Sequence, residues 1–363
     1  MPARAAQGRQ HNLGLVMRVL HGDGPTSRAS VARDTGLTRA TVSDLVGELI
    51  DLGYVVETGL EEQARPGKPG TLVDVNRRGR TVVAVDLTEQ EALRAAVLDL
   101  DGTILTEVQR PAAPGETLDP QVVLELTREA IATAGAPVIG IGVGSPGIVA
   151  EDGSVELATA LGWQHVPLSD LLSRGTGLPV HVRNDADVAA QAHHALDDGT
   201  DDFILGKRGP GVGAGIIIAG RPVLGAHRAA GELGHVSVGT DGGPLCRCGR
   251  QGCLETWVSV PSLAAVIDGP DPEQVDAALR TAGQRLGIAL GPIVAALDLT
   301  EVVLAGPERF IPDVLLASTQ DTLRDRVISS TSRDLVVRPA HDCSNIVLRG
   351  AAGLVLAEQL GIS

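Results

Sequence analysis

The segment of residues 231–255 reads GELGHVSVGTDGGPLCRCGRQGCLE and holds three of the four cysteines of the chain. His235 is followed by Cys246, Cys248 and Cys253, and one imidazole with three thiolates is a ligand set that suits tetrahedral zinc. Glycines between the cysteines let one loop wrap the ion, and four protein ligands leave no position open for a substrate. The segment therefore predicts a structural Zn²⁺ site. A redox pair of cysteines is the alternative, but it leaves His235 and the glycines unexplained.

Two carboxylates flank this metal loop, at Glu232 and Glu255, and Asn184-Asp185 follows a strand-like apolar run elsewhere in the chain. A sugar ring presents several hydroxyls, each a donor and an acceptor, so a site for it needs carboxylates and an amide that converge. The side chains around one loop can converge, and the second ring nitrogen of His235 can donate to a ligand. The pattern favours a sugar ligand. The alternative is that the two glutamates only hold the loop in place.

The composition predicts an α/β body. The chain has 363 residues, of which 43% are hydrophobic, but it contains only two Trp, one Tyr and two Phe. A chain of this length can bury a sizeable core and is typical of two or three domains. A core with so few aromatic rings is built from Val, Leu, Ile and Ala, which favours helices stacked on parallel strands.

The sequence carries no sign of export or membrane insertion. No apolar run approaches the roughly 18 residues that a membrane span needs, and no apolar segment follows the arginines near the start. Four cysteines, three of them clustered, are too few for a disulfide framework. We expect a cytoplasmic protein with no membrane partner. Cys343 is expected to be buried as a small apolar side chain, and His193 and His194 to lie on the surface of an Ala-rich helix.

The net charge of −15 is unevenly distributed along the chain. Residues 1–80 contain 11 Arg and Lys against 9 Asp and Glu, whereas residues 81–363 contain 19 against 36. A slightly basic head therefore precedes an acidic body. A head of such low charge attracts DNA only weakly, so charge alone does not predict DNA binding.

The apolar spacing of the head predicts three short helices and a wing. The first helix has apolar residues at helical spacing from residue 13 to residue 20. Ser27 can cap a second helix that ends at Gly36, and Thr38 can cap a third. The third helix carries a core stripe that consists of Val42, Leu45, Val46, Leu49 and Ile50. Residues 54–56 and 71–75 follow as the two strands of a wing.

The face of the third helix opposite this stripe is suited to DNA. It begins with small or polar side chains that let the backbone approach base edges, and Arg39 can bond guanine. The wing tip, residues 65–70, offers two cations to a minor groove. A flexible linker is the alternative for the tip, and protein docking is the alternative for the whole head. The predicted DNA contacts are Ser27, Arg28, Thr38, Arg39, Ala40, Thr41, Ser43, Arg65 and Lys68.

The chain divides into a winged helix-turn-helix domain at residues 1–75, a linker at residues 76–80 and a body at residues 81–363. In the body, strands are expected at residues 81–87, 92–98, 103–108 and 138–143, with a helix near residues 118–134. A similar order recurs with strands at residues 203–205, 213–219, 221–224 and 301–304. Two comparable halves imply a duplicated α/β architecture with the site in the cleft between them.

These motifs together resemble the ROK family of repressors, open reading frames and sugar kinases. The resemblance covers nearly the whole chain and rests on residues 231–235, 244–255, 145–147, 178–180 and 184–186. It implies an actin-like, sugar-kinase-type body of two lobes, with a duplicated βββαβα pattern. An N-terminal winged helix-turn-helix looks like the repressor branch. The resemblance also implies a homo-oligomer, either a homodimer or a homotetramer.

Carried over position by position, the resemblance assigns roles to residues of the body. The zinc ligands fall on His235, Cys246, Cys248 and Cys253, and the sugar contacts fall on Asn184, Asp185, Glu232, His235 and Glu255. In a kinase, Asp185 would take the proton from the attacking sugar hydroxyl.

The nucleotide side departs from the family pattern. Kinase members carry Asp-x-Gly-Gly-Thr, but here Asp86 is followed by Leu-Thr-Glu-Gln-Glu, which places carboxylates where a polyphosphate would bind. The Gly-Thr-Gly loop becomes Gly-Pro-Gly at residues 209–211, which removes a hydroxyl and an amide donor, and the adenosine-side glycine pair is reduced at residues 305–307. On the sugar side, Ala160-Leu161 stands where many members carry an asparagine. We therefore predict no kinase activity and a vestigial base at Asp185.

The resulting prediction is a sugar-responsive DNA-binding transcriptional regulator, a repressor, with a structural Zn²⁺ and a degenerate ATP site. Its expected partners are double-stranded operator DNA and a sugar or sugar derivative. Two alternatives stay open. One is an ATP-dependent sugar kinase with a DNA-binding head, and the other is a constitutive DNA-binding regulator with a vestigial sugar site.

Overall fold

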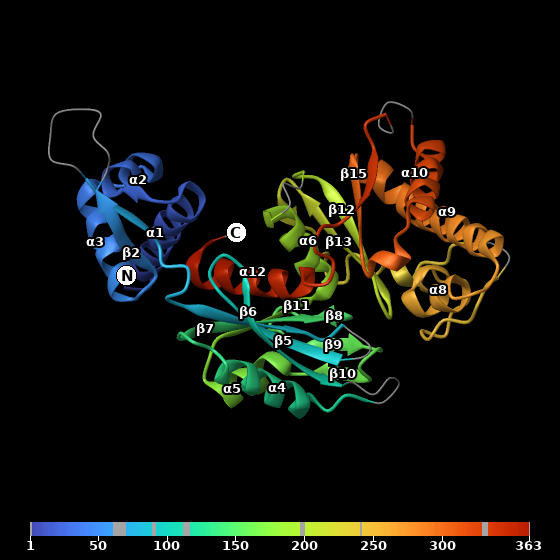
Figure 1. Ribbon diagram of the computed structural model, residues 1–363, viewed down its shortest axis with the longest axis horizontal. Helices are drawn as coiled ribbons and strands as arrows, with labels where there is room; N and C mark the ends of the chain where they lie inside the picture. The colour runs from blue at the N-terminus through green and yellow to red at the C-terminus, as the bar shows by residue number, and fades with distance from the viewer. Residues whose placement is uncertain are drawn as a thin grey trace.

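The computed structural model describes residues 2–60, 70–88, 92–111, 117–196, 200–239, 242–328 and 333–362. Figure 1 shows a helical head at the N-terminus and a body in which two sheets lie apart, each covered by helices. Among the described residues, no helix is long and apolar enough to cross a membrane.

The head contains three helices and a three-stranded sheet. Its elements are α1 (Pro2–Asp23), β1 (Thr26–Ser27), α2 (Arg28–Thr35), α3 (Arg39–Asp51), β2 (Val55–Leu60) and β3 (Thr71–Val75). The two predicted wing strands pair with each other as β2 and β3, and a short strand that was not predicted, Thr26-Ser27, pairs with β3 to give a sheet of order β1-β3-β2. The first helix also starts earlier than its apolar stripe indicates.

The two predicted helix caps in the head are confirmed. The Ser27 hydroxyl accepts a hydrogen bond from the Ser30 amide at 3.4 Å, and the Thr38 hydroxyl accepts from the Thr41 amide at 3.2 Å. Gly36 ends α2 with a φ of 72°, a left-handed conformation that favours glycine. These local signals fix where α3 begins and therefore which side chains stand in its exposed first turn.

The body is built on two five-stranded sheets of the same topology. The first sheet has the order β11-β7-β4-β5-β6 and the second has the order β14-β13-β12-β15-β16. In each, a hairpin-connected antiparallel part joins two strands that pair in parallel. The predicted duplication is thus confirmed, and each sheet defines one lobe.

The first lobe surrounds its sheet with short helices. Its elements are β4 (Thr81–Asp86), β5 (Ala92–Leu98), β6 (Ile104–Pro111), α4 (Pro120–Ala132), β7 (Val138–Ser145), α5 (Leu168–Thr176) and β11 (Val180–Asn184). A small sheet that the sequence did not predict, of order β10-β9-β8, adds β8 (Ile148–Val149), β9 (Val155–Ala158) and β10 (Trp163–Val166).

The second lobe contains the metal loop and longer helices. Its elements are β12 (Phe203–Arg208), β13 (Val212–Ile218), β14 (Arg221–Pro222), η1 (Leu233–His235), α7 (Glu255–Val258), α8 (Val260–Ile267), α9 (Pro272–Leu297), β15 (Glu301–Ala305), η2 (Glu308–Phe310), α10 (Asp313–Arg326) and β16 (Val336–Pro339). β14 is shorter than the expected residues 221–224, although the Val223 amide still donates to the Ile216 carbonyl at 2.9 Å.

Helix α6 (Asp185–Leu196) packs against both lobes. Helix α12 (Ile346–Leu360) packs against α6, the first lobe and α1 of the head. They pack closely at Gly350, where a Cβ atom would lie 2.0 Å from the Val188 carbonyl oxygen. Figure 1 shows α12 between the N-terminal helices and α6. At its C-terminal end, Gly361 approaches Gly14 of α1 so closely that a Cβ atom on Gly361 would lie 3.0 Å from the Gly14 Cα.

The head and the body share one apolar core. Met17 and Leu20 of α1 belong to the same buried cluster as Leu348, Val355 and Leu356 of α12. The cluster also includes Leu98 and Leu100 of the first lobe, so apolar packing as well as the linker joins the head to the body.

Two minor expectations are corrected by the fold. His193 is fully buried, not on the surface, because α6 is packed on both sides; its Nε2 lies 3.0 Å from Arg338 Nη2 and its ring meets Phe203 edge-on. His194 is partly exposed and lies 3.0 Å from Asp201 Oδ1. Cys343 is half-buried, and its thiol donates to the Ala340 carbonyl at 3.2 Å.

Candidate metal centre and ligand cleft

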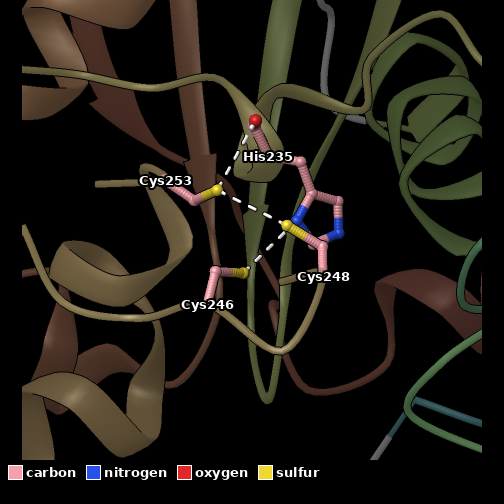
Figure 2. A group of neighbouring side chains, drawn as sticks. All are labelled: His235, Cys246, Cys248 and Cys253. Atoms are coloured by element: carbon pink, nitrogen blue, oxygen red, sulfur yellow. Dashed lines mark hydrogen bonds between the residues drawn. The ribbon is translucent and has the colours of Figure 1, made fainter. Parts of the chain in front are cut away.

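The structure brings the four predicted metal ligands together. Their ligand atoms all lie within 4.8 Å of one another, and Figure 2 shows the four side chains turned toward a common centre. Cys246 Sγ lies 3.6 Å from His235 Nδ1, and Cys248 Sγ lies 3.6 Å from Cys253 Sγ. Tetrahedral zinc with Zn–S bonds of about 2.3 Å separates two sulfurs by about 3.8 Å, so the residues present fit this ion.

The loop that carries the cysteines folds through local backbone turns. The Cys246 amide donates to the Arg250 carbonyl at 2.8 Å, and the Gly249 amide donates to the Cys246 carbonyl at 2.9 Å. Gly249 and Gly252 have φ values of 86° and 71°, which a side chain would strain. The spacing Cys-x-Cys and the two glycines therefore form one compact ligand loop.

The protonation of the thiols also suits a metal-dependent loop. Burial, together with the neighbouring Cys248 and Cys246 thiols, raises the pKa of Cys253 to about 12, and burial raises the pKa of Cys246. The backbone N–H of Arg250 lowers the pKa of Cys248. Because thiolates are the ligand form, an ion would have to displace protons from the buried pair.

All five predicted sugar contacts line one cavity of about 570 Å³ between the lobes. Glu232, His235 and Glu255 form one side of it, which we call the metal-side wall. Asn184 and Asp185 form its floor, at the junction of β11 and α6. Segments far apart in sequence thus converge as the carboxylate and amide pattern predicts.

Asn184 also builds the floor. Its side-chain carbonyl oxygen accepts from the amides of Ala186 at 2.8 Å and Asp187 at 3.2 Å, which caps the first turn of α6. Its side-chain NH₂ donates to the Gly147 carbonyl at 2.8 Å. Asn184 therefore fixes Asp185 in place and ties the floor to the loop after β7.

The metal-side wall holds one carboxyl group, Glu232, whose charged form is disfavoured. Burial, followed by the charges of Asp185 and Glu255, raises the pKa of Glu232 to about 7. Glu255 is also buried, and one of its oxygens accepts from the Val212 amide at 3.3 Å. Glu232 can therefore donate or accept a hydrogen bond near neutral pH, as alternating sugar hydroxyls require.

Asp187, which the sequence reasoning missed, lies just beneath the floor. Burial, followed by the Asp185 charge, raises the pKa of Asp187 to about 7, whereas Arg183 opposes the shift. Its position in the first turn of α6, two residues after Asp185, was the available signal. The two side chains therefore share one electrostatic environment.

The cavity lining also holds a lysine that the sequence reasoning missed. Lys207 Nζ lies 2.9 Å from Asp185 Oδ2 and donates to Thr88 Oγ1 at 3.1 Å. Thr88 Oγ1 in turn donates to Asp86 Oδ1 at 2.6 Å. We call Thr88 and Lys207 the lysine-side wall. The predicted carboxylates Glu89 and Glu91 lie outside the described residues.

The predicted DNA contacts differ in how the structure presents them. Thr38, Arg39, Ala40 and Ser43 are exposed in or beside the first turn of α3, and Thr41 is partly exposed. Ser27 is buried as a helix cap, so its side chain does not reach the surface, and Arg28 is half-buried and donates to Glu57 at 2.9 Å. Arg65 and Lys68 lie outside the described residues.

Comparison with known proteins separates the body from the head. A model of the ROK family matches residues 82–358, and a model of the IclR helix-turn-helix domain matches residues 15–59. A xylose repressor of Caldicellulosiruptor bescii is 26% identical over 389 residues, which span 97% of this chain and 97% of that protein.

Solved structures agree with this division. A ROK family transcriptional regulator, a homologue of the Escherichia coli Mlc protein, matches with a TM-score of 0.81 at 24% identity and covers 97% of this chain and 96% of its own. A ROK family glucokinase of Streptomyces griseus, solved with glucose and AMPPNP, gives a TM-score of 0.64 at 28% identity and covers 76% of this chain and 98% of its own. The regulator therefore shares the fold of nearly the whole chain, and the glucokinase shares three quarters of it.

Proposed function

This chain belongs to the ROK family, and from that premise we propose that it is a sugar-responsive, DNA-binding transcriptional repressor. One observation carries the proposal: a helix-turn-helix with an exposed first turn of α3 shares its core with α12, which packs on the helix that begins at Asp185 of the cleft. The full-length similarity to a xylose repressor supports it.

In this proposal the head, residues 1–75, binds double-stranded operator DNA and is joined by residues 76–80 to the body, residues 81–363. The N-terminal turn of α3 enters the major groove, where an Arg39 guanidinium can bond guanine O6 and N7. The small side chains of Ala40 and Ser43 let the helix backbone approach the bases. The wing with Arg65 and Lys68 follows the adjacent groove.

The cleft binds a sugar or sugar derivative through Asn184, Asp185, Glu232, His235 and Glu255. A ligand changes DNA affinity only if it binds two states of the body with different affinity. Closure of the lobes on a sugar would shift α6 and α12, and the contact of α12 with α1 offers a route from that movement to the head.

Zn²⁺ is the ion proposed for the metal centre, held by His235, Cys246, Cys248 and Cys253. When bound, the ion cross-links the loop and fixes His235 and Glu255 in the metal-side wall; its four protein ligands give it a structural role. His235 could use its other ring nitrogen toward the sugar.

Sugar phosphorylation is not part of this proposal. A kinase needs a surface that binds the triphosphate, and the lysine-side wall instead pairs its cation with Asp185, the residue that would serve as the base. Pro210 removes a backbone donor from the glycine loop that would cradle phosphate. Asp185 is therefore assigned to sugar binding as a vestigial base.

We also propose a homodimer or a homotetramer that acts in the cytoplasm. Paired heads would bind the two half-sites of an inverted repeat, about one helical turn apart on DNA. Dimeric binding makes the distance between the two heads the quantity that a sugar-driven change in the body can alter.

The test uses the full chain and operator duplexes selected from a random library. Fluorescence anisotropy then measures DNA affinity with and without D-xylose, D-glucose and D-galactose. Arg39→Ala is expected to weaken specific binding by about 1 to 3 kcal/mol. Arg280→Ala, on the exposed surface of α9 in the body, is the matched control and should leave it unchanged. Robust ATP turnover with a sugar, or DNA binding that no sugar alters, would contradict the proposal.

A further inference from the structure

Part of the cavity lining is apolar and is not used by the proposed sugar contacts. This apolar arm is lined by Leu93, Leu118, Val122, Ile148, Leu157 and Leu161, and Thr117, Asp119 and Thr159 line the cavity beside it. It belongs to the first lobe and comprises side chains from β5, the start of α4 and the small sheet β10-β9-β8. Ala160, at the junction with the polar end, contributes a methyl group and no hydrogen-bonding group.

The apolar arm is held in shape by polar contacts behind it. The Leu118 amide donates to the Leu161 carbonyl at 3.0 Å, and the Trp163 indole N–H donates to the Leu118 carbonyl at 2.6 Å. Trp163 is itself buried. The backbone of Leu118 is therefore hydrogen-bonded to that of Leu161. The arm is preformed, so a ligand that binds in it needs little ordering of side chains.

The arm and the polar floor are built as one piece. The Asn184 side chain donates to the Gly147 carbonyl at 2.8 Å. Gly147 has a φ of 83°, and a Cβ atom there would lie 2.0 Å from the Leu157 carbonyl oxygen. The backbone of Leu157 thus lies directly against the loop that Asn184 fixes, so a ligand on the floor has the arm beside it.

Leu157 is the most exposed of the six residues that line this arm. Its relative exposure is 39%, although it lines a cavity whose other leucines are more buried. A cavity of about 570 Å³ falls within the roughly 300 to 1,000 Å³ of sites that hold drug-sized ligands. A free monosaccharide would satisfy the polar end and leave this apolar surface in contact with water.

We propose that the ligand is a glycoside whose aglycone is an apolar group about the size of a phenyl ring. The sugar ring lies against Asp185 and the metal-side wall, and the aglycone lies in the apolar arm. This inference rests on the proposed function, because it assumes that the polar end binds a sugar. It names the chemical class of that sugar: an aryl or bulky alkyl glycoside, in preference to a free sugar.

Calorimetric titration of the full-length, metal-loaded protein tests the proposal. For D-glucose, D-xylose and D-galactose, three forms are compared: the free sugar, its methyl glycoside and its phenyl glycoside, in both anomers. For at least one sugar, the phenyl glycoside should bind at least tenfold more tightly than the methyl glycoside, which corresponds to about 1.4 kcal/mol. The methyl glycoside controls for blocking of the anomeric hydroxyl.

Two leucine variants locate the effect. Leu157→Ser should remove most of the preference for phenyl over methyl, with a several-fold smaller loss of affinity for the methyl glycoside. Leu105→Ser is the matched control, since Leu105 is 37% exposed but lies on β6 outside the cavity lining. This variant should keep the full preference. Both leucines are partly exposed, so neither substitution empties a core.

The outcomes separate this inference from the proposed function. If free sugars bind and alter DNA affinity but phenyl glycosides bind no better, the aglycone proposal is overturned and the repressor proposal stands. If phenol alone binds as tightly as the phenyl glycosides, the ligand is not a glycoside and the inference fails. If no sugar binds in any form, both proposals fail together.

Discussion

The two walls of the cleft carry different kinds of chemistry. On the metal-side wall, Glu232 and Glu255 come from segments that one metal loop holds together, and their carboxylates face a common cavity. On the lysine-side wall, Lys207 is already paired with Asp185 and bonded to Thr88, so its cation is neutralised within the protein. The metal-side wall presents hydrogen-bond acceptors to a polar ligand. The charge of the lysine-side wall is paired with Asp185 of the protein.

This difference contrasts two kinds of recognition within one cleft. Hydroxyl recognition depends on a few carboxylates and an amide, which local turns and one cap hold in place. Phosphate recognition depends on several backbone amides and an unpaired cation, so a single proline and one internal ion pair weaken it. The four predictions below test the contrast, beginning with the largest effect.

Loss of the metal should abolish sugar binding. Cys253→Ser removes a buried ligand, and the loop that positions His235 and Glu255 then loses its cross-link. Structural zinc sites have apparent binding energies of roughly 10 to 16 kcal/mol, so thermal stability should also fall. Elemental analysis measures metal content, and calorimetry measures sugar affinity. Cys343→Ser, away from the cluster, should keep both. Full sugar affinity without metal would separate this wall from the ion.

Glu232→Gln should weaken sugar binding strongly on the metal-side wall. A hydrogen bond to a charged group contributes about 1.5 to 3 kcal/mol, so at pH 8, above the raised pKa of Glu232, the affinity should fall by roughly 10-fold to 150-fold. The amide fills the same space, and burial already disfavours the glutamate charge, so the fold should hold. Calorimetric titration checks the loss, with Glu129→Gln on the exposed face of α4 as the control. Unchanged affinity would remove Glu232 from the site.

Lys207→Met should have a smaller effect on sugar affinity. Asp185 would keep its carboxylate but lose a partner that orients it; one hydrogen bond contributes about 0.5 to 1.5 kcal/mol, which is roughly twofold to twelvefold. ATP turnover should stay absent, because removal of the lysine does not supply the missing phosphate contacts. Lys207→Arg should recover part of the affinity. A gain of kinase activity would show that the ion pair alone had blocked catalysis.

Asp187→Asn should leave sugar affinity almost unchanged and alter only the pH dependence of stability. Because burial and the Asp185 charge raise the pKa of Asp187 from 3.8 to about 7, the folded state holds a proton that the unfolded state releases. The stabilising contribution is therefore complete below pH 4 and is lost as the pH rises through 7, by at most about 1.4 kcal/mol per pH unit.

Urea unfolding between pH 4 and pH 8 measures this slope. The Asp187→Asn variant should show a flatter loss of unfolding free energy with rising pH than the parent protein. Asp152→Asn, in an exposed turn where hydrogen bonds to Ser154 lower the pKa of Asp152, serves as the control and should not flatten it. Equal slopes for parent and Asp187→Asn would assign the proton to another carboxylate of the floor.

The sequence was most informative where chemistry and spacing are local. His235 and the three cysteines lie in one segment, and their residue types restrict the ion, so the cluster could be predicted before its geometry was known. The caps at Ser27 and Thr38 and most body strands were equally local. The duplication was visible because each half repeats the same order of apolar runs.

The features that the sequence did not predict depend on contacts between distant segments, and the spacing of apolar residues does not encode such contacts. Lys207 reaches Thr88 across more than a hundred residues, and nothing near either residue signals the pair. His193 was placed on the surface because an Ala-rich helix reads as exposed, yet α6 lies between α12 and the second sheet. The short strands β8 to β10 were missed because they are only two to four residues long.

The close approach of Gly14 and Gly361 has a consequence for engineering. A fusion of this N-terminal domain to a different ligand-binding domain would have to include the last turn of α12. Helix α1 packs on that turn so closely that a side chain at Gly14 or Gly361 would be crowded. A chimera cut only at the linker would uncover the face of α1 around Gly14 that rests on the end of α12. The boundary between the two domains therefore includes the contact of α1 with the end of α12, and not only the linker.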